Sequence, residues 1–93
     1  MEGRGFTGLS RIIGNLSSLE VLYLGGNYLT GLPGSIGSLS SLRELWLDHN
    51  PLGRLPLALL RLPSLAKLVV DGRLEGDAVV KSLAARGVEV EFR

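Results

Sequence analysis

Leucine recurs along this chain with a period of 23 residues. Residues 19–41 carry the pattern L-x-x-L-x-L-x-x-N-x-L, residues 42–64 repeat it in register, and Leu65 begins a third copy. In each copy, two leucines separated by one residue alternate as side chains do in a β-strand. Both leucines therefore share one face, and the residue between them lies on the other. The pattern predicts three parallel strands centred on residues 21–24, 44–47 and 67–70.

The remainder of each copy returns the chain along the opposite, convex side. Asn27 and Asn50 come where the chain leaves a strand, and an amide side chain there can satisfy backbone groups that the turn exposes. Leucine–proline pairs at residues 32–33 and 55–56 favour an extended or tightly turned segment over a long helix. One coil of this kind cannot bury its leucines alone, so the core must form between stacked coils.

The N-terminal end departs from the period. Residues 6–18 align with the convex half of a copy whose strand is missing, and residues 1–5 form a flexible lead-in that is too short to supply it. The strand at residues 19–24 is therefore expected at an uncapped edge of the sheet, beside an apolar layer of Phe6, Leu9 and Ile13. Uncapped edges attract strands of other chains, so we expect self-association through this edge.

The C-terminal end departs in a different way. Arg73 stands where the repeat has asparagine and Glu75 where it has leucine, and an arginine at that inward position would leave its charge unpaired. Asp77 can cap a helix with an apolar face at residues 79–84, and Gly87 suits its left-handed end. Residues 88–92 then alternate strictly, which predicts a half-buried fourth strand. A helix followed by a charged edge strand is typical of a C-terminal cap.

Composition narrows the class of protein. With 45% hydrophobic but only 5% aromatic residues, the core must be aliphatic. The absence of cysteine excludes a disulfide or thiolate–metal framework, and a formal charge of +1 provides no basic stripe for nucleic acid. No run approaches the roughly 18 apolar residues of a membrane span, and the N-terminus lacks an apolar signal segment. A cytoplasmic, intracellular location is expected.

The full pattern, L-x-x-L-x-L-x-x-N-x-L-x-x-L-P-x-x-I-G-x-L-x-x-L, resembles the 23-residue class of leucine-rich repeats in intracellular Ras-suppressor-like and Scribble-like proteins. Similar repeats occur in plant intracellular Ras-group proteins and in Roco-type bacterial proteins. The resemblance covers roughly residues 6–71. It implies a curved α/β solenoid with a concave parallel sheet that binds proteins, among them a small GTPase or another signalling protein, and it implies no catalytic activity.

We therefore expect one domain over residues 1–93. It divides into a partial repeat (6–18), two full repeats (19–41 and 42–64) and a degenerate repeat with a C-terminal helix–strand cap (65–93). The fold class is α/β, a short leucine-rich repeat solenoid.

Motifs that could carry chemistry are weak. Residues 3–8 match G-x-G-x-x-G, but a dinucleotide site needs a strand before the motif and only two residues precede it. His49 is the only histidine, far short of the three or four ligands of a zinc site, so we expect an exposed side chain. We expect no cofactor, no metal and no catalysis, because no arrangement of residues satisfies an active-site checklist.

The concave face is the remaining candidate site. Outward strand positions form columns, since equivalent residues on neighbouring strands lie about 4.8 Å apart. One column holds Val21, Glu44, Lys67 and Glu89, and the other holds Tyr23, Trp46, Val69 and Glu91. Asp48 adds a residue at the turn end of the strands. The predicted partner-binding residues are Val21, Tyr23, Glu44, Trp46, Asp48, Lys67 and Val69.

Two interpretations of the aromatic pair remain open. Exposed Trp46 and Tyr23 are typical binding anchors, or they pack on each other and on Val69 and stiffen the sheet. At the level of function, the first hypothesis is a protein-binding or scaffolding module without catalysis of its own. The alternative is a structural or capping fragment of a larger repeat protein, whose activity lies in a missing domain.

Overall fold

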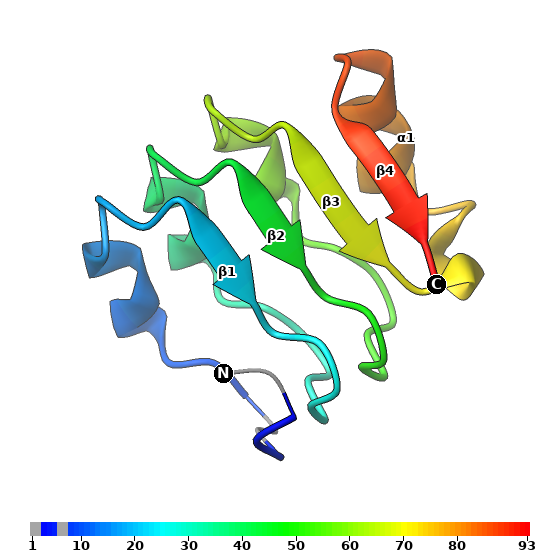
Figure 1. Ribbon diagram of the computed structural model, residues 1–93, viewed down its shortest axis with the longest axis horizontal. Helices are drawn as coiled ribbons and strands as arrows, with labels where there is room; N and C mark the ends of the chain where they lie inside the picture. Colours follow the sequence, from blue (N-terminus) through cyan, green and yellow to red (C-terminus); the bar gives the residue numbers. More distant parts are fainter. Residues whose placement is uncertain (1–2, 6–7) are drawn as a thin grey trace.

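The computed structural model describes residues 3–5 and 8–93, which form a short solenoid in which each repeat is one coil (Figure 1). Strands β1 (Val21–Tyr23), β2 (Glu44–Trp46), β3 (Lys67–Val70) and β4 (Glu89–Phe92) make a parallel sheet in the order β1-β2-β3-β4. The register pairs Leu22 with Leu45 and Leu45 with Leu68, so equivalent repeat positions are direct neighbours. The predicted α/β class, the three repeat strands and the fourth strand are confirmed.

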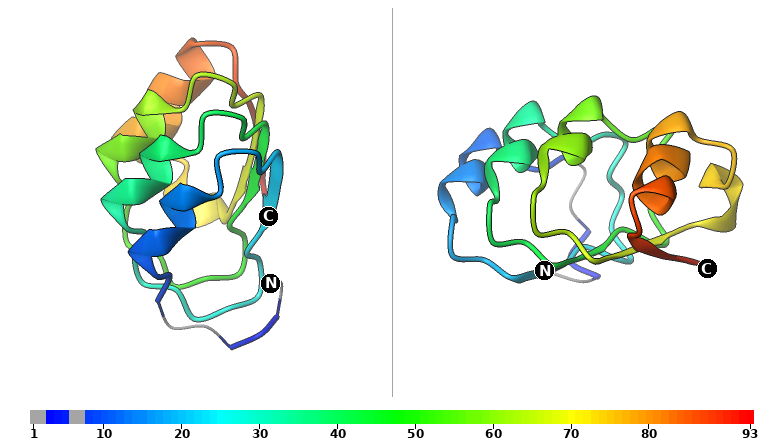
Figure 2. Two further views of the ribbon diagram at one scale, coloured as in Figure 1. Left: turned by 90° about the vertical axis from the view of Figure 1, so that its left-hand side faces the viewer. Right: turned by 90° about the horizontal axis from the view of Figure 1, so that it is seen from above.

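A layer of short 3-10 helices lies behind the sheet (Figure 2). These are η1 (Arg11–Asn15), η2 (Gly34–Ser38) and η3 (Leu57–Arg61), which stack on one another in chain order. Pro33 and Pro56 directly precede η2 and η3 with φ near −70°, which matches the fixed angle of proline and sets the start of each helix. Gly14 and Gly37 allow the close stacking, because a Cβ on Gly37 would lie 2.8 Å from the Ala58 carbonyl oxygen.

Leucine fills the space between the two layers, as the low aromatic content predicts. The largest fully buried side chains are almost all leucines: Leu24, Leu29, Ile36, Leu39, Leu42, Leu45, Leu47, Leu52, Leu59, Leu62, Leu68 and Leu83. Each buried leucine or isoleucine contributes about 1.5–3 kcal/mol relative to an exposed one.

Asparagine joins neighbouring coils, as expected from its place after the strands. The Asn50 amide nitrogen donates to the carbonyls of Leu24 (2.9 Å) and Leu47 (3.1 Å), which belong to two successive coils. Its side-chain oxygen accepts from the backbone N–H of Leu29 at 3.1 Å. Asn27 donates in the same way to the Leu24 carbonyl at 2.9 Å. These buried amides satisfy backbone groups that no strand partner reaches.

The described part of the N-terminal lead-in follows the repeat, although it was expected to be a flexible segment. Gly3 has φ 64°, close to the 72° of Gly26 and the 60° of His49, which stand one and two periods later. The Gly3 N–H donates to the Gly25 carbonyl at 2.8 Å, as the Gly26 N–H donates to Asp48 at 3.0 Å. The lead-in therefore supplies a turn to the solenoid. No described residue pairs with the other side of β1, which is the edge strand predicted.

The apolar layer beside that edge differs from the prediction. Phe6 lies outside the described residues, Leu9 is half-buried and Ile13 is buried at 6% exposure. The exposed apolar side chains are instead Ile12 (69%) and Leu16 (49%) of the first coil.

At the C-terminal end, the repeat stops at Arg73, which is exposed and does not take the inward place of asparagine. Its guanidinium is not left unpaired, because it donates to the Asn50 carbonyl and lies 3.7 Å from the Asp71 carboxylate. Leu74, one residue before the expected position, fills the leucine site at 5% exposure and Glu75 stays exposed. The short helix η4 (Gly72–Leu74) makes this one-residue shift.

The predicted C-terminal cap is present as a helix and a strand. Helix α1 (Ala78–Ala85) is capped by the Asp77 carboxylate, which accepts from Val79 and Val80, and Gly87 is left-handed at φ 96°. Helix α1 packs against η3 and β4, and β4 closes this edge of the sheet.

Candidate binding surface

The open face of the sheet, meaning the face turned away from the 3-10 helices, holds the two predicted columns. The register pairs Val21 with Glu44, Glu44 with Lys67, and Lys67 with Glu89. In the second column it joins Tyr23, Trp46, Val69 and Glu91.

Tyr23 is an exposed large hydrophobic side chain on this face. It is 47% exposed, while Trp46, Val21, Glu44 and Lys67 are half-buried. The Tyr23 and Trp46 ring centroids lie 5.3 Å apart with an interplanar angle of 52°. This is a favourable tilted aromatic contact, so Trp46 fixes the position of the Tyr23 ring.

Trp46 is held by several neighbours. Its indole N–H donates to the Glu44 carboxylate at 3.1 Å. Two cations lie over its ring: Lys67 Nζ is 5.0 Å from the centroid, and the Arg93 guanidinium carbon is 5.1 Å from it. Contacts of this kind attract a cation to the aromatic face. The indole is therefore a fixed platform whose polar group and ring are already in contact with the protein.

Glu91 holds both cations in place. Its carboxylate accepts from Arg93 Nε at 2.5 Å and lies 3.8 Å from Lys67 Nζ. The hydrogen bond and charge of Arg93, followed by the charge of Lys67, lower the pKa of Glu91, and they outweigh the opposing effect of burial. The two cations thus favour the ionised form of Glu91.

The prediction that Val69 faces solvent is wrong. It stands in the correct column but is fully buried, because it lies between the larger register neighbours Trp46 and Glu91. Val69 offers no surface to a partner.

Asp48, also predicted to contact a partner, is only 4% exposed. Its carboxylate occupies the space left by Gly25, where an added Cβ would lie 2.8 Å from Oδ1. Oδ2 pairs with Nδ1 of His49 at 2.9 Å, and the His49 side chain is 68% exposed, as expected. Among the described residues, Asp48 Oδ1 has no hydrogen-bond partner.

Sequence reasoning missed Arg93. It follows the alternating segment 88–92 and has no equivalent in the repeat, so the column rule does not place it. Its backbone extends the ladder with β3, where its N–H donates to the Val70 carbonyl at 2.8 Å and its carbonyl accepts from Gly72 at 3.0 Å. Those bonds bring the guanidinium onto the open face.

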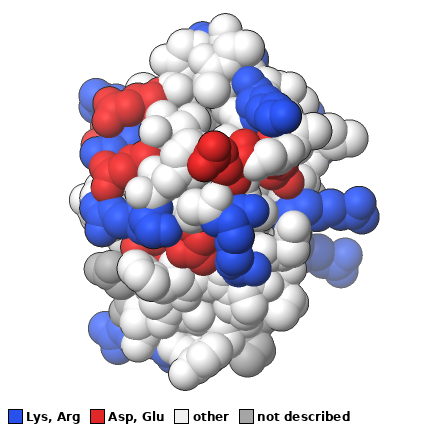
Figure 3. Space-filling model, turned by 90° about the vertical axis from the view of Figure 1, so that its right-hand side faces the viewer, with Lys and Arg blue, Asp and Glu red and all other residues white. Residues whose placement is uncertain are grey.

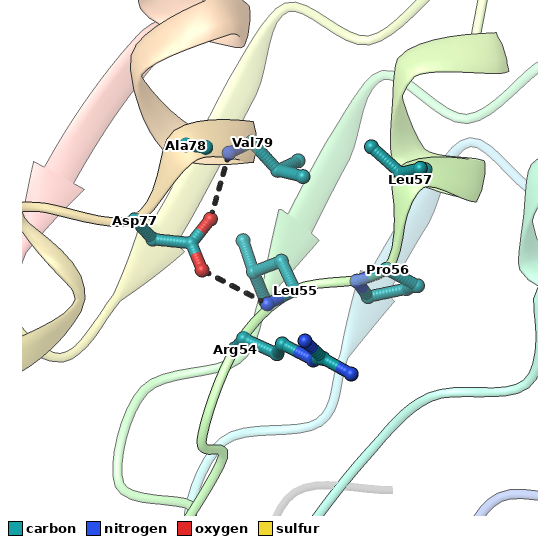
Figure 4. Close-up of a pocket in the computed structure, with 7 residues that line it drawn as sticks. All are labelled: Arg54, Leu55, Pro56, Leu57, Asp77, Ala78 and Val79. Carbon is teal, nitrogen blue, oxygen red and sulfur yellow. Dashed lines mark hydrogen bonds between the residues drawn. The ribbon is translucent and has the colours of Figure 1, made fainter.

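A second concave region lies between η3 and α1 (Figure 4). This hollow of about 500 Å³ is lined by residues 54–57 and 77–79. Both Asp77 oxygens accept backbone N–H groups, from Val79 at 2.8 Å and from Leu55 at 3.2 Å, while Arg54 points away from the carboxylate. Both oxygens of the Asp77 carboxylate are used in these backbone hydrogen bonds, and no basic side chain of the lining pairs with it, so the hollow offers no acid–base pair for catalysis.

Within the described residues, no cluster of three or more histidine, cysteine or acidic side chains could hold a metal ion. Over the same residues, no helix has the length and apolarity needed to cross a bilayer.

Comparison with known families agrees with the fold. A family model described as leucine rich repeat matches residues 4–52, which is more than half of the chain. The chain therefore belongs to the leucine-rich repeat family, whose domains generally mediate protein interactions and are typically non-catalytic. The match includes the lead-in from Arg4 and ends before β3 and the cap. No protein of curated function matches the chain.

Proposed function

We propose that the open face of the sheet binds a protein or peptide, with Tyr23 as its contact residue and Trp46 as the platform beneath it. The observation that supports this proposal is the exposure of Tyr23 on a fixed indole. An aromatic ring that is already held in place loses little conformational freedom on binding, which favours affinity.

The surroundings of Tyr23 favour a polypeptide over a polyanion. Glu44, Lys67 and Glu89 alternate in sign along the neighbouring column. Mixed charge around an aromatic centre can orient a partner and raise its association rate, while the aromatic group supplies most of the affinity. By resemblance to the intracellular repeat class, the partner is a small GTPase or another signalling protein in the cytoplasm.

The proposal is tested with peptides selected on the wild-type chain from a displayed random library. Their affinities are then measured for Tyr23→Ala, for Trp46→Ala and for Arg61→Ala, a control in η3 on the opposite layer. Truncation at either aromatic position should cost at least about 2 kcal/mol, roughly a 30-fold loss of affinity. Arg61→Ala should bind like wild type. Binding that survives both aromatic truncations but fails in Arg61→Ala would place the site on the helical layer instead.

A further inference from the structure

The two ends of the solenoid differ in chemistry. The C-terminal end is covered by α1 and β4, and acidic and basic side chains are interspersed over it (Figure 3). The N-terminal end consists of η1 and β1, which face the viewer in the left view of Figure 2. It exposes Ile12 at 69% and Leu16 at 49%.

No described residue packs on Leu16 in the way that a preceding coil packs on its repeat equivalents. Its equivalents one and two periods later, Leu39 and Leu62, are both fully buried. Leu19 is half-buried, while Leu42 at the same repeat position has 0% exposure. These side chains are apolar like their buried equivalents, but at this end no described residue covers them.

The size of the Ile12 side chain does not suit a further coil packed on the N-terminal end with the spacing seen between the other coils. Its equivalents are Ser35 and Ala58, which lie in the close contacts between successive 3-10 helices. A Cβ on Gly14 would lie 2.6 Å from the Ser35 carbonyl oxygen and 3.0 Å from its Cβ. That spacing admits a small residue, and an isoleucine at this position would prevent an equally close approach. The end therefore suits an occupant with a different docking geometry.

We infer that the N-terminal end binds a second copy of this chain, head to head. A two-fold axis perpendicular to the sheet would make the two β1 strands antiparallel neighbours and continue the hydrogen-bonded sheet. It would also leave both layers of 3-10 helices on the same side, so that Ile12 and Leu16 of both copies pack together. The charged, capped C-terminal ends point outward, and association stops at the dimer.

The size of the end limits the area of the contact. The Cα extents are 29, 26 and 18 Å, and Figure 1 shows that the strands succeed one another along the longest. The cross-section is then about 500 Å² per copy, or about 1,000 Å² in total, which lies in the class of weak, transient interfaces. The dimer should form reversibly at high micromolar concentration.

Sedimentation equilibrium over a wide concentration range tests this inference. Wild type should shift from the mass of one 9.9 kDa chain towards twice that mass. Ile12→Glu and Leu16→Glu should stay monomeric with an unchanged far-UV spectrum, since both side chains are exposed. Leu57→Glu is the matched control, because Leu57 is 74% exposed on η3, away from this end. It should associate like wild type.

A second experiment tests the orientation. The chain has no cysteine, so a single engineered thiol can form only an intermolecular disulfide. Oxidation should convert Ile12→Cys or Leu16→Cys to a covalent dimer, because residues near a two-fold axis meet their own copies, and Leu57→Cys should remain monomeric. A monomer at all concentrations, a dimer that persists in both glutamate variants, or growth beyond the dimer would overturn the inference.

Discussion

Replacing Asn50 with alanine tests how the coils are joined. This side chain is 3% exposed and bonds to two coils at once. In Asn50→Ala, the Leu29 N–H loses its acceptor and the Leu47 carbonyl loses this donor. The Leu24 carbonyl keeps the bond from Asn27, and the Asp48 carbonyl, which Asn50 also contacts, keeps the bond from the Gly26 N–H. The substitution therefore leaves two of the four backbone groups bonded by Asn50 without this partner.

The expected cost follows from those two groups. A buried polar group left without a partner costs about 1–3 kcal/mol, so the loss of two should remove about 2–6 kcal/mol. A chain of 93 residues typically has about 5–14 kcal/mol of stability in all. At about 4–8 °C per kcal/mol for a domain of this size, Tm should fall by roughly 10 °C or more.

Urea and thermal unfolding followed by far-UV circular dichroism measure this loss. Asn15→Ala is the control, because Asn15 is exposed in η1 and should change stability little. Asn50→Asp should be worse than Asn50→Ala at neutral pH, since a carboxylate would face the Leu24 and Leu47 carbonyls. If Asn50→Ala melts within a few degrees of Asn15→Ala, the asparagine does not join the coils energetically.

Three further predictions concern the core, the helix stacking and the charge cluster. Leu45→Ala truncates a side chain with 0% exposure and should cost about 2–5 kcal/mol; a melting temperature close to wild type would contradict the repeat register. Gly37→Ala should destabilise by about 1–3 kcal/mol because the new methyl meets the Ala58 carbonyl, whereas Gly34→Ala, in open space, should be nearly neutral in the same unfolding assay. The lowered pKa of Glu91 means that its ion pairs stabilise the fold above the ordinary glutamate range and are lost as pH falls through the lowered value. Acid titration should then change the fluorescence of Trp46, the only tryptophan, as the cations leave its ring, and Glu91→Gln should lack this transition.

The fold was largely predictable because the repeat specifies it redundantly. Each leucine position occurs two or three times along the chain. Because the coils stack in parallel, equivalent positions become direct neighbours in the sheet. The same regularity explains the turn geometry: Gly26 and His49 share left-handed backbone angles, although only the glycine adopts them without cost. Where the period ends, at Arg73, the one-residue shift to Leu74 could not be read from spacing.

The site was predicted less well, because the burial of an outward residue depends on the size of its neighbours. The column rule placed Val69 correctly, yet Trp46 and Glu91 beside it are large enough to cover it. Asp48 is buried because Gly25, one period earlier, leaves room for its carboxylate. Both outcomes depend on contacts across strands, which no single repeat encodes.

The open face thus has two unequal halves, and this links the two proposals. Around Trp46, the cations form ion pairs with Glu91 and lie over the indole ring. Tyr23, in contrast, is exposed on β1, beside the edge of the sheet with which no described strand pairs. A two-fold axis perpendicular to the sheet keeps both open faces on one side, so a head-to-head dimer would bring the two Tyr23 side chains near the axis. A peptide long enough to cross the axis should then bind the dimer more tightly than the monomer, because its second contact becomes intramolecular. Ile12→Glu should weaken such a peptide without altering a short one, and Leu57→Glu should weaken neither. Equal affinities of the long peptide for wild type and Ile12→Glu would show that the two surfaces act independently.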